Sequence, residues 1–305
     1  MRIVFMGTPD FAVASLTALL HADFNIVGVI TAPDKPAGRG QKLQESAVKK
    51  FALKKGLNIL QPEKLKNPEF LEELKALNAD LQVVVAFRML PEVVWNMPEK
   101  GTINLHASLL PQYRGAAPIN WAIINGEKES GVTTFFLKQE IDTGDVLFSE
   151  KIEITEEMTA SDLHDALINV GSQLLTKTIK AIEANDYQEK PQESFGINEL
   201  KHAPKIFKED CKINWNKNNE EVYNLIRGLS SYPTAFTHFL GKVLKIYLAE
   251  KEDKEPGISA GAFLTDHKTY LKFASNDGFI LVKEIQQEGK KRMNIEEFLR
   301  GVRIS

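Results

Sequence analysis

Three features are scarce in this 305-residue sequence, and each scarcity excludes a class of protein or site. Cys211 is the only cysteine, so neither an intrachain disulfide nor a multi-cysteine metal site can form. The apolar runs, such as residues 83–87, are far shorter than the roughly 18 residues that a membrane-spanning helix needs. The six histidines are dispersed without metal-ligand spacing, so we expect no metal.

The sequence also has no large excess of positive or of negative residues. The sequence has 38 Lys and Arg against 41 Asp and Glu, a net charge of −3, which excludes a small basic protein that coats nucleic acid through bulk charge. A strand-like run begins at residue 2 and leaves no room for a signal peptide. Together with the single cysteine, this predicts a cytoplasmic protein that has no membrane partner.

Short apolar runs alternate with helical patterns over the first 188 residues. The runs before residue 88 are apolar rather than alternating, which is typical of strands covered on both faces, and the helices between them imply right-handed β–α–β units. The sequence therefore predicts an α/β domain at residues 1–188 with a doubly wound, mostly parallel sheet of Rossmann-like type. Its expected strands lie at residues 3–6, 26–31, 58–60, 81–87, 102–106, 132–137 and 146–154, and the segment 33–43 is expected to be a loop.

The pattern changes after a polar, proline-bearing segment at residues 189–205, which we interpret as a linker. One helix is expected at residues 219–227, and five candidate strands follow at 235–240, 243–249, 257–264, 269–273 and 278–285. Closely spaced strands with little helix indicate a small β-barrel domain of oligonucleotide-binding type over residues 206–305. These residues carry a net charge of +2, which is either ordinary scatter or a modestly basic surface that touches phosphate.

The first strand-to-helix turn, at residues 7–10, has the sequence Gly-Thr-Pro-Asp and only one glycine. A dinucleotide site needs the further glycines of Gly-x-Gly-x-x-Gly, which let the backbone approach the pyrophosphate. The turn therefore favours a plain connection between strand and helix, and we expect no NAD.

Residues 104–115 form the densest group of polar side chains. Asn104 and His106 are two residues apart, so on an extended strand they project to the same face. The strand end leads into a proline-containing loop, where open α/β sheets bind ligands. An amide and an imidazole that converge there would form an oxyanion site, in which each donor is worth roughly 3 kcal/mol in a transition state. The alternative is that His106 is a hydrogen-bonded polar residue of a buried strand.

A second polar signal, Ile-Asp-Thr-Gly-Asp, follows the next expected strand at residues 141–145. Turn chemistry alone explains Asp145, whereas Asp142 could reach the crevice of His106, orient the imidazole and accept a proton. Ser108 lacks a Gly-x-Ser-x-Gly elbow, and no histidine is near Cys211 in the sequence, so no nucleophilic triad is predicted. The residues instead predict direct acyl transfer from a bound donor to a bound amine.

These motifs resemble the methionyl-tRNA formyltransferase family of 10-formyltetrahydrofolate-dependent enzymes. The resemblance is carried by residues 5–12, 33–40, 104–111, 113–119 and 142–145, and more loosely by 203–206, 213–215 and 226–227. Glycinamide ribonucleotide and sugar-nucleotide formyltransferases share the segment around Asn104 and His106. The narrower resemblance rests on the Gly-Thr-Pro-Asp-Phe start, the Lys-Pro-Ala-Gly-Arg-Gly loop and the C-terminal domain.

The resemblance implies a role for individual residues. Asn104, His106 and Asp142 would be the catalytic residues. The tRNA acceptor stem would meet the loop that bears Lys35, Arg39 and Lys42. The folate would lie against two segments, Phe87, Arg88, Met89 and Leu90 in the first and Ser108, Leu109, Leu110 and Pro111 in the second. The first segment departs from the family, which has Tyr-Gly where this sequence has Phe87-Arg88.

The implied reaction is attack by the α-amine of initiator methionyl-tRNA on the formyl carbon of 10-formyltetrahydrofolate, through a tetrahedral oxyanion. It would give N-formylmethionyl-tRNA for translation initiation, from an enzyme expected to be a monomer. Two alternatives stay open. One is a formyltransferase for a small amine such as a nucleotide sugar, and the other is a non-catalytic RNA-binding protein on an old enzyme scaffold.

Overall fold

The computed structural model describes residues 1–37, 42–197 and 199–302. The chain divides into two compact units whose segments are interleaved. The first unit comprises Met1–Gly115, Gly131–Ile152 and Asp165–Lys201, and the second comprises Ala116–Ser130, Glu153–His164 and His202–Ser305. Within the described ranges, no helix is long and apolar enough to cross a membrane.

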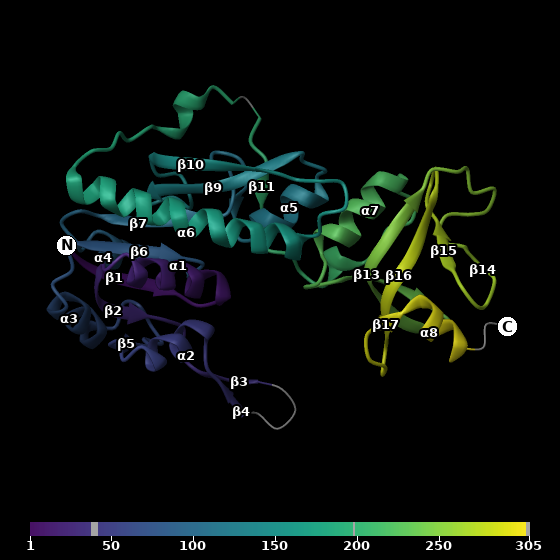
Figure 1. Cartoon of the computed structure of the whole chain (residues 1–305), viewed down its shortest axis with the longest axis horizontal. Helices are drawn as coiled ribbons and strands as arrows, with labels where there is room; N and C mark the ends of the chain where they lie inside the picture. The colour runs from purple at the N-terminus through teal and green to yellow at the C-terminus, as the bar shows by residue number, and fades with distance from the viewer. Residues whose placement is uncertain (38–41, 198, 303–305) are drawn as a thin grey trace. The chain divides into compact units, whose positions relative to one another are not determined.

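The first unit is built on a seven-stranded sheet of order β10–β9–β7–β6–β1–β2–β5 (Figure 1). Four of its strand pairs are parallel and the β7–β9 pair is antiparallel, so the prediction of a mostly parallel α/β sheet is confirmed. The strands are β1 (Arg2–Gly7), β2 (Asn25–Ile30), β5 (Ile59–Leu60), β6 (Leu81–Val85), β7 (Thr102–His106), β9 (Glu129–Phe136) and β10 (Val146–Glu153).

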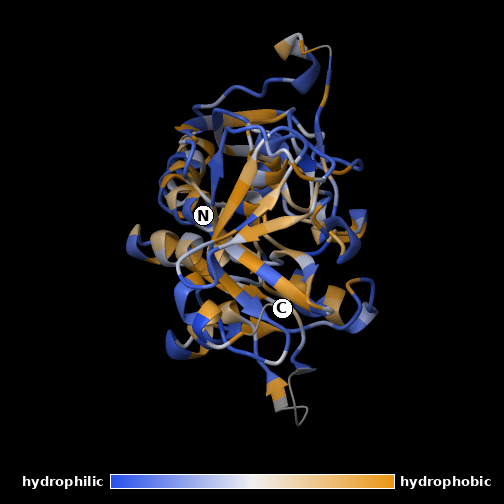
Figure 2. Ribbon diagram, turned by 90° about the vertical axis from the view of Figure 1, so that its right-hand side faces the viewer, coloured by the Kyte–Doolittle hydropathy of each residue, from blue (hydrophilic) through white to orange (hydrophobic). Residues whose placement is uncertain are grey.

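Several strands in Figure 2 carry long orange, hydrophobic stretches, and β1 and β6 are buried along nearly their whole length. Burial on both faces explains why these strands read as continuous apolar runs. The helices of this part of the chain are α1 (Asp10–His21), α2 (Ala47–Lys54), α3 (Pro68–Ala76), α4 (Glu92–Trp95) and α6 (Ala160–Ala184).

Gly7 ends β1 because nothing larger fits there. A Cβ at this position would lie 2.5 Å from the Cβ of Ala12 and 3.0 Å from the carbonyl oxygen of Val85. The glycine therefore lets α1 and β6 pack closely around the turn, which agrees with a plain strand-to-helix connection.

The segment at residues 33–43 differs from the expected loop. β3 (Lys35–Ala37) pairs in antiparallel register with β4 (Lys42–Gln44), and Lys35 lies opposite Gln44. The expectation of a loop without strands is therefore wrong. Proline, glycine and lysine obscured the strand signal, since these residues are depleted in strands generally.

The second unit carries an antiparallel sheet of order β12–β13–β16–β15–β14, with β17 paired to β16. It forms a half-barrel, which confirms the predicted small β domain. Its elements are α5 (Pro118–Ile124), α7 (Asn219–Gly228), β12 (Ala235–Phe239), β13 (Lys242–Glu252), β14 (Phe263–Thr265), β15 (Leu271–Ala274), β16 (Phe279–Gln287), β17 (Met293–Asn294) and α8 (Ile295–Arg300).

The third expected strand, at residues 257–264, is mostly wrong. Only its last two residues belong to β14. The chain turns before the strand begins, because Gly257 and Gly261 adopt positive φ values of 63° and 82°. The core of the unit is mainly aliphatic and includes an aromatic pair, in which Trp215 stacks on Phe273 with ring centroids 4.8 Å apart.

Cys211 lies in this core and should react slowly with thiol reagents. Burial raises the pKa of its thiol, and its Sγ donates a hydrogen bond to the carbonyl of Phe207 at 3.3 Å. Because the thiolate is the reactive form, we expect labelling by a chromogenic disulfide reagent at pH 7.5 to be on the order of 100-fold slower in the folded than in the denatured protein. Equal rates would mean that the turn at Glu209–Cys211 opens readily.

Candidate active site

β7 carries Asn104 and His106 to the carboxyl edge of the sheet between β6 and β9. The imidazole of His106 is 7% exposed, and its Nε2 lies 2.9 Å from the carbonyl oxygen of Tyr113. Since a carbonyl can only accept, Nε2 carries a proton and the carbonyl fixes the orientation of the ring. The other ring nitrogen, Nδ1, faces Asp142.

Asp142 reaches the site from the turn between β9 and β10. Its Oδ2 lies 3.8 Å from Nδ1 of His106 and accepts a hydrogen bond from the backbone N–H of Gly115 at 2.9 Å. The structure thus brings together two predicted residues from separate strand ends. At 3.8 Å the two groups do not hydrogen-bond directly, but catalytic contacts are often long before substrate binds.

Three non-glycine residues near these strand ends adopt left-handed backbone conformations. Ala86 follows β6 with φ 47°, Tyr113 lies in the loop after β7 with φ 59°, and Asp142 has φ 55°. Each such residue costs about 1 kcal/mol or more relative to glycine or to an ordinary conformation. Strain of this kind persists where surrounding contacts enforce it, which is common at functional sites.

Asn104 is half-buried, and its amide forms no hydrogen bond to any residue in the described ranges. On β7 it lies opposite Val84 of β6 and Phe135 of β9, neither of which has a polar side chain. Its amide can therefore donate to a ligand without breaking a protein contact.

The expected folate segment at 108–111 is mostly fixed by the protein itself. The hydroxyl of Ser108 donates to the carbonyl of Gln112 at 2.6 Å, and the carbonyl of Ser108 accepts from Oγ1 of Thr133 at 2.7 Å. Leu110 is buried against Phe135. Ser108 and Leu110 therefore shape the loop, with Leu109 half-buried and Pro111 buried beside them.

In the other expected folate segment, residues 87–90, one side chain is exposed and another is held by hydrogen bonds to the protein. Met89 is 69% exposed, whereas Phe87 and Leu90 pack in the core beside β6. The Arg88 guanidinium donates to the carbonyls of Pro62 and Glu63, and burial lowers its pKa. Its Nε is buried without a hydrogen-bond partner among the described residues.

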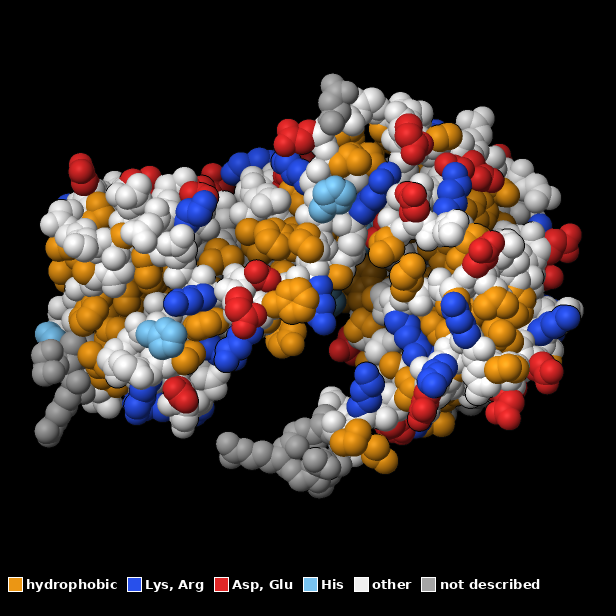
Figure 3. Space-filling view, turned by 180° about the vertical axis from the view of Figure 1, so that it is seen from behind, with side chains coloured by type: hydrophobic (Ala, Val, Ile, Leu, Met, Phe, Trp, Pro, Cys, Tyr) orange, Lys and Arg blue, Asp and Glu red, His pale blue; other side chains and the backbone are white. Residues whose placement is uncertain are grey.

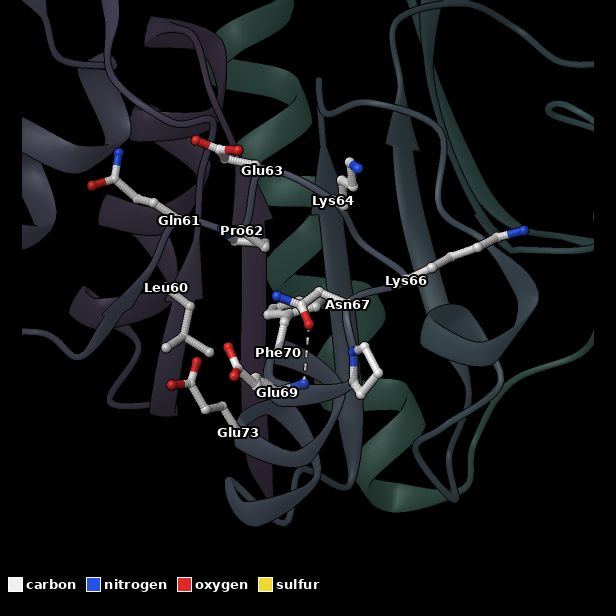
Figure 4. Close-up of a pocket in the computed structure, with 11 residues that line it drawn as sticks. Leu60, Gln61, Pro62, Glu63, Lys64, Lys66, Asn67, Glu69, Phe70 and Glu73 are labelled. Atoms are coloured by element: carbon white, nitrogen blue, oxygen red, sulfur yellow. Dashed lines mark hydrogen bonds between the residues drawn. The ribbon is translucent and has the colours of Figure 1, made fainter.

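A groove of about 730 Å³ lies beside this segment, between β5 and α3 (Figure 4). Its lining mixes acidic and basic side chains, and Arg88 holds its Pro62–Glu63 wall through the two carbonyl contacts. Asn104, His106 and Asp142 do not line it. The lining residues are Leu60, Gln61, Pro62, Glu63, Lys64, Lys66, Asn67, Pro68, Glu69, Phe70 and Glu73.

Two of the three residues expected to contact tRNA, Lys35 and Lys42, lie on the paired strands β3 and β4. Lys35 is exposed on β3; Arg39 lies outside the described residues, and of Lys42 only the backbone, in β4, is described. The base of the hairpin is anchored by an ion pair between Asp34 and Lys49, whose hydrogen bond lowers the pKa of the Asp34 carboxyl.

Gln192 is a buried residue of the site that the sequence did not reveal. It begins the short 3-10 helix η1 (Gln192–Phe195), inside the segment interpreted as a linker, and it is 2% exposed. Its Nε2 donates to the carbonyls of Asp142 and Gly144, and its Oε1 accepts from Arg114. The only available signal was Pro-Gln in a polar segment, which has no period that indicates burial.

Comparison with known families identifies the class. A family model described as "Formyl transferase" matches residues 1–179, and one described as "Formyl transferase, C-terminal domain" matches residues 205–303. The parallel sheet with polar residues at its strand ends and the half-barrel that follows are thus those of a formyl transferase.

Individual relatives narrow the class. The chain is 55% identical to the methionyl-tRNA formyltransferase of Parabacteroides distasonis, over 99% of this chain and 95% of that protein. It is 51% identical to the methionyl-tRNA formyltransferase of Flavobacterium johnsoniae, over 100% of this chain and 97% of that one. The chain belongs to the methionyl-tRNA formyltransferase family.

Two solved structures share the fold at lower identity. The N-formyltransferase of Helicobacter canadensis, in complex with folinic acid and dTDP-3-aminofucose, has a TM-score of 0.70 at 24% identity, over 94% of this chain and 99% of that chain. HypX from Aquifex aeolicus, in complex with tetrahydrofolic acid, has a TM-score of 0.67 at 19% identity, over 99% of this chain and 48% of that chain. Both likenesses concern the fold alone.

Proposed function

We propose that the protein transfers the formyl group of 10-formyltetrahydrofolate to the α-amine of initiator methionyl-tRNA. The observation that carries this proposal is the approach of His106 and Asp142 at the strand ends, 3.8 Å apart. Asn104 lies on the same strand as His106, and its amide has no hydrogen-bond partner among the described residues. The names of the relatives support the tRNA acceptor, and the folates bound to the two structural neighbours support a folate donor.

The chemistry requires positioning and charge stabilisation rather than a strong base. An α-amine has a pKa near 7.7, so part of it is already neutral at pH 7. Asn104 donates to the formyl oxygen as it becomes an oxyanion. His106 adds a second donor, Nδ1, when its ring carries a proton on both nitrogens, since its Nε2–H is held by the Tyr113 carbonyl. Asp142 orients the imidazole and accepts the proton that the attacking amine loses.

The proton and bond changes balance within this site. A bond forms between the amine nitrogen and the formyl carbon, and the bond between that carbon and the folate nitrogen breaks. The folate nitrogen takes up one proton and the amine gives one up, so Asp142 ends the turnover in its starting state. The donor would be held by the segments 87–90 and 108–111, of which Met89 is open to a ligand.

We divide the protein into a catalytic domain at residues 1–188, a linker at 189–205 and a tRNA-binding domain at 206–305. The family matches at 1–179 and 205–303 support this division. Truncation after residue 204 is a poor test of whether the C-terminal domain binds tRNA, because it would also remove packing partners of residues 116–130 and 153–164 in the second unit. Arg227, for example, donates to the carbonyl of Met158 at 2.9 Å. The proposal takes the enzyme to be cytoplasmic and monomeric, and light scattering in solution tests the monomer.

The decisive assay gives the purified protein 10-formyltetrahydrofolate and charged initiator tRNA and measures formylmethionine. Uncharged tRNA, glycinamide ribonucleotide and a nucleotide amino sugar serve as parallel acceptors. We expect product only with methionyl-tRNA. Formylation of the amino sugar instead would support the small-amine alternative, and tRNA binding without formyl transfer to any acceptor would support the RNA-binding alternative.

The β3–β4 hairpin yields a prediction on salt dependence. Acidic and basic side chains are intermixed on the face drawn in Figure 3, so a few specific cations rather than a uniform field should hold the tRNA. We expect Lys35→Ala and Arg39→Ala each to weaken methionyl-tRNA binding and to lower the slope of log K against log salt by about 1. Filter binding over a range of KCl concentrations measures both quantities.

The matched control for the hairpin is Lys75→Ala, which removes the same charge from an exposed position in the last turn of α3. It should leave the salt slope unchanged. If the hairpin variants also keep the wild-type slope, these side chains make no phosphate contact and the proposed role of the hairpin is wrong.

A further inference from the structure

Gln192 is buried between the two chain segments that hold the imidazole and the carboxylate. Its side-chain Nε2 donates to the carbonyl oxygens of Asp142 and Gly144, each at 2.8 Å. Its Oε1 accepts from Nε and Nη2 of Arg114 at 3.0 and 2.6 Å. One amide therefore uses both of its N–H donors and both lone pairs of its oxygen, and it lies 2% exposed.

The chemistry of these partners fixes which end of the amide points where. A guanidinium can only donate and a backbone carbonyl can only accept, so the Gln192 oxygen must face Arg114 and its nitrogen must face the turn at 141–145. No other side chain of this length has one accepting and one donating end. A glutamate would keep the Arg114 contact and oppose the two carbonyls.

Gln192 also closes a ring of hydrogen bonds around the site. Arg114 stands between Tyr113, whose carbonyl holds Nε2 of His106, and Gly115, whose N–H holds Oδ2 of Asp142. Gln192 links Arg114 to the backbone of Asp142. The side chains of His106 and Asp142 are therefore both held by the segment 113–115. Without Gln192, the strained turn at Asp142, with φ 55°, would lose two of the contacts that hold it.

We propose that Gln192 is a positioning residue that sets the distance between Asp142 and His106, and that it acts on catalysis only through Asp142. This inference rests on the proposed function. It makes the segment at 189–205 part of the active-site architecture, although Gln192 itself touches no substrate.

The test compares Gln192→Ala and Gln192→Glu with the wild type in the formylmethionine assay. A displacement of about 1 Å in a reacting group can cost on the order of 100-fold, so we expect kcat to fall by about 30- to 100-fold in both variants. KM for methionyl-tRNA and for the folate should stay within about twofold, since no binding contact is removed.

A double mutant separates positioning from general stabilisation. In an Asp142→Asn background, Gln192→Ala should lower kcat by less than about threefold, because the group that it positions is already disabled. Gln112→Ala is the matched control. Gln112 also bridges its loop to the polar segment, through the carbonyl of Glu199 and the N–H of Lys201, but it does not contact the Asp142 turn. We expect it to cost less than about threefold.

A measurement that does not depend on turnover tests the role of Gln192 separately from the proposed function. With 15N-labelled histidine, the ring signals of His106, assigned by their loss in His106→Ala, should move in Gln192→Ala and Asp142→Asn but not in Gln112→Ala. Unmoved signals in Gln192→Ala, or a full additive loss in the double mutant, would overturn the positioning role. Absence of formylmethionine from the wild type would overturn the proposed function, while the spectra would still decide whether Gln192 positions the pair.

Discussion

Asp142→Asn should lower kcat for formylation of methionyl-tRNA by on the order of 1,000-fold, within the range expected when a positioned general base is removed. Asparagine is nearly the same size, tolerates the left-handed backbone that Asp142 adopts at φ 55°, and still offers an oxygen to the N–H of Gly115. The variant therefore removes the proton acceptor and keeps the turn. Steady-state kinetics should show KM values within about threefold of wild type.

Asp145→Asn is the control for a carboxylate lost from the same turn. Asp145 pairs with Lys138 at 2.8 Å rather than with His106. We expect its kcat within about threefold of wild type, because the Asp145 carboxylate pairs with Lys138, whose side chain is 53% exposed, and makes no ion pair with His106. If Asp142→Asn retained more than a third of wild-type kcat, or if both variants were equally impaired, Asp142 would not be the proton acceptor.

The central sheet was predictable because its signal is local. The strands β1 and β6 are buried on both faces, so they appear in the sequence as short apolar runs. In β7, the apolar residues Ile103 and Leu105 alternate with polar ones, a period of two. That periodicity also predicted that Asn104 and His106 share a face and lie at an edge where ligands bind. The hairpin at 35–44 was missed because its strands have three residues each and include proline and lysine.

The arrangement around Asp142 could not be read from the sequence in the same way. The distance between Asp142 and His106 is set by long-range hydrogen bonds through Gly115, Arg114 and Gln192. Backbone carbonyls and N–H groups leave no mark on residue type, and a single buried glutamine in a polar segment has no periodic neighbours. The hydroxyl of Ser108 likewise donates to a backbone carbonyl, that of Gln112, which the sequence could not indicate.

Gly144→Ala should disable the enzyme as severely as a substitution in the catalytic pair. A Cβ at this position would lie 1.5 Å from the carbonyl oxygen of Phe136, a separation that non-bonded atoms cannot adopt, so the turn must open. Opening it breaks the bond from Gln192 to the Gly144 carbonyl and moves Asp142 away from His106. We expect kcat to fall by on the order of 100-fold or more. We also expect the free energy of unfolding to fall by about 2–3 kcal/mol.

The expected loss in Gly144→Ala comes from a steric clash of the added Cβ, not from backbone strain. Substitution of a second glycine, Gly56, distinguishes these two causes. Gly56 follows α2 with φ 66°, and a Cβ there would meet no atom within 4 Å. Gly56→Ala should therefore lower the free energy of unfolding by only about 1 kcal/mol and leave kcat unchanged. Urea denaturation and the formylmethionine assay measure both effects. Because Gly144 touches the pair only through the turn, a Gly144→Ala enzyme with wild-type kcat would show that the position of Asp142 does not limit the reaction.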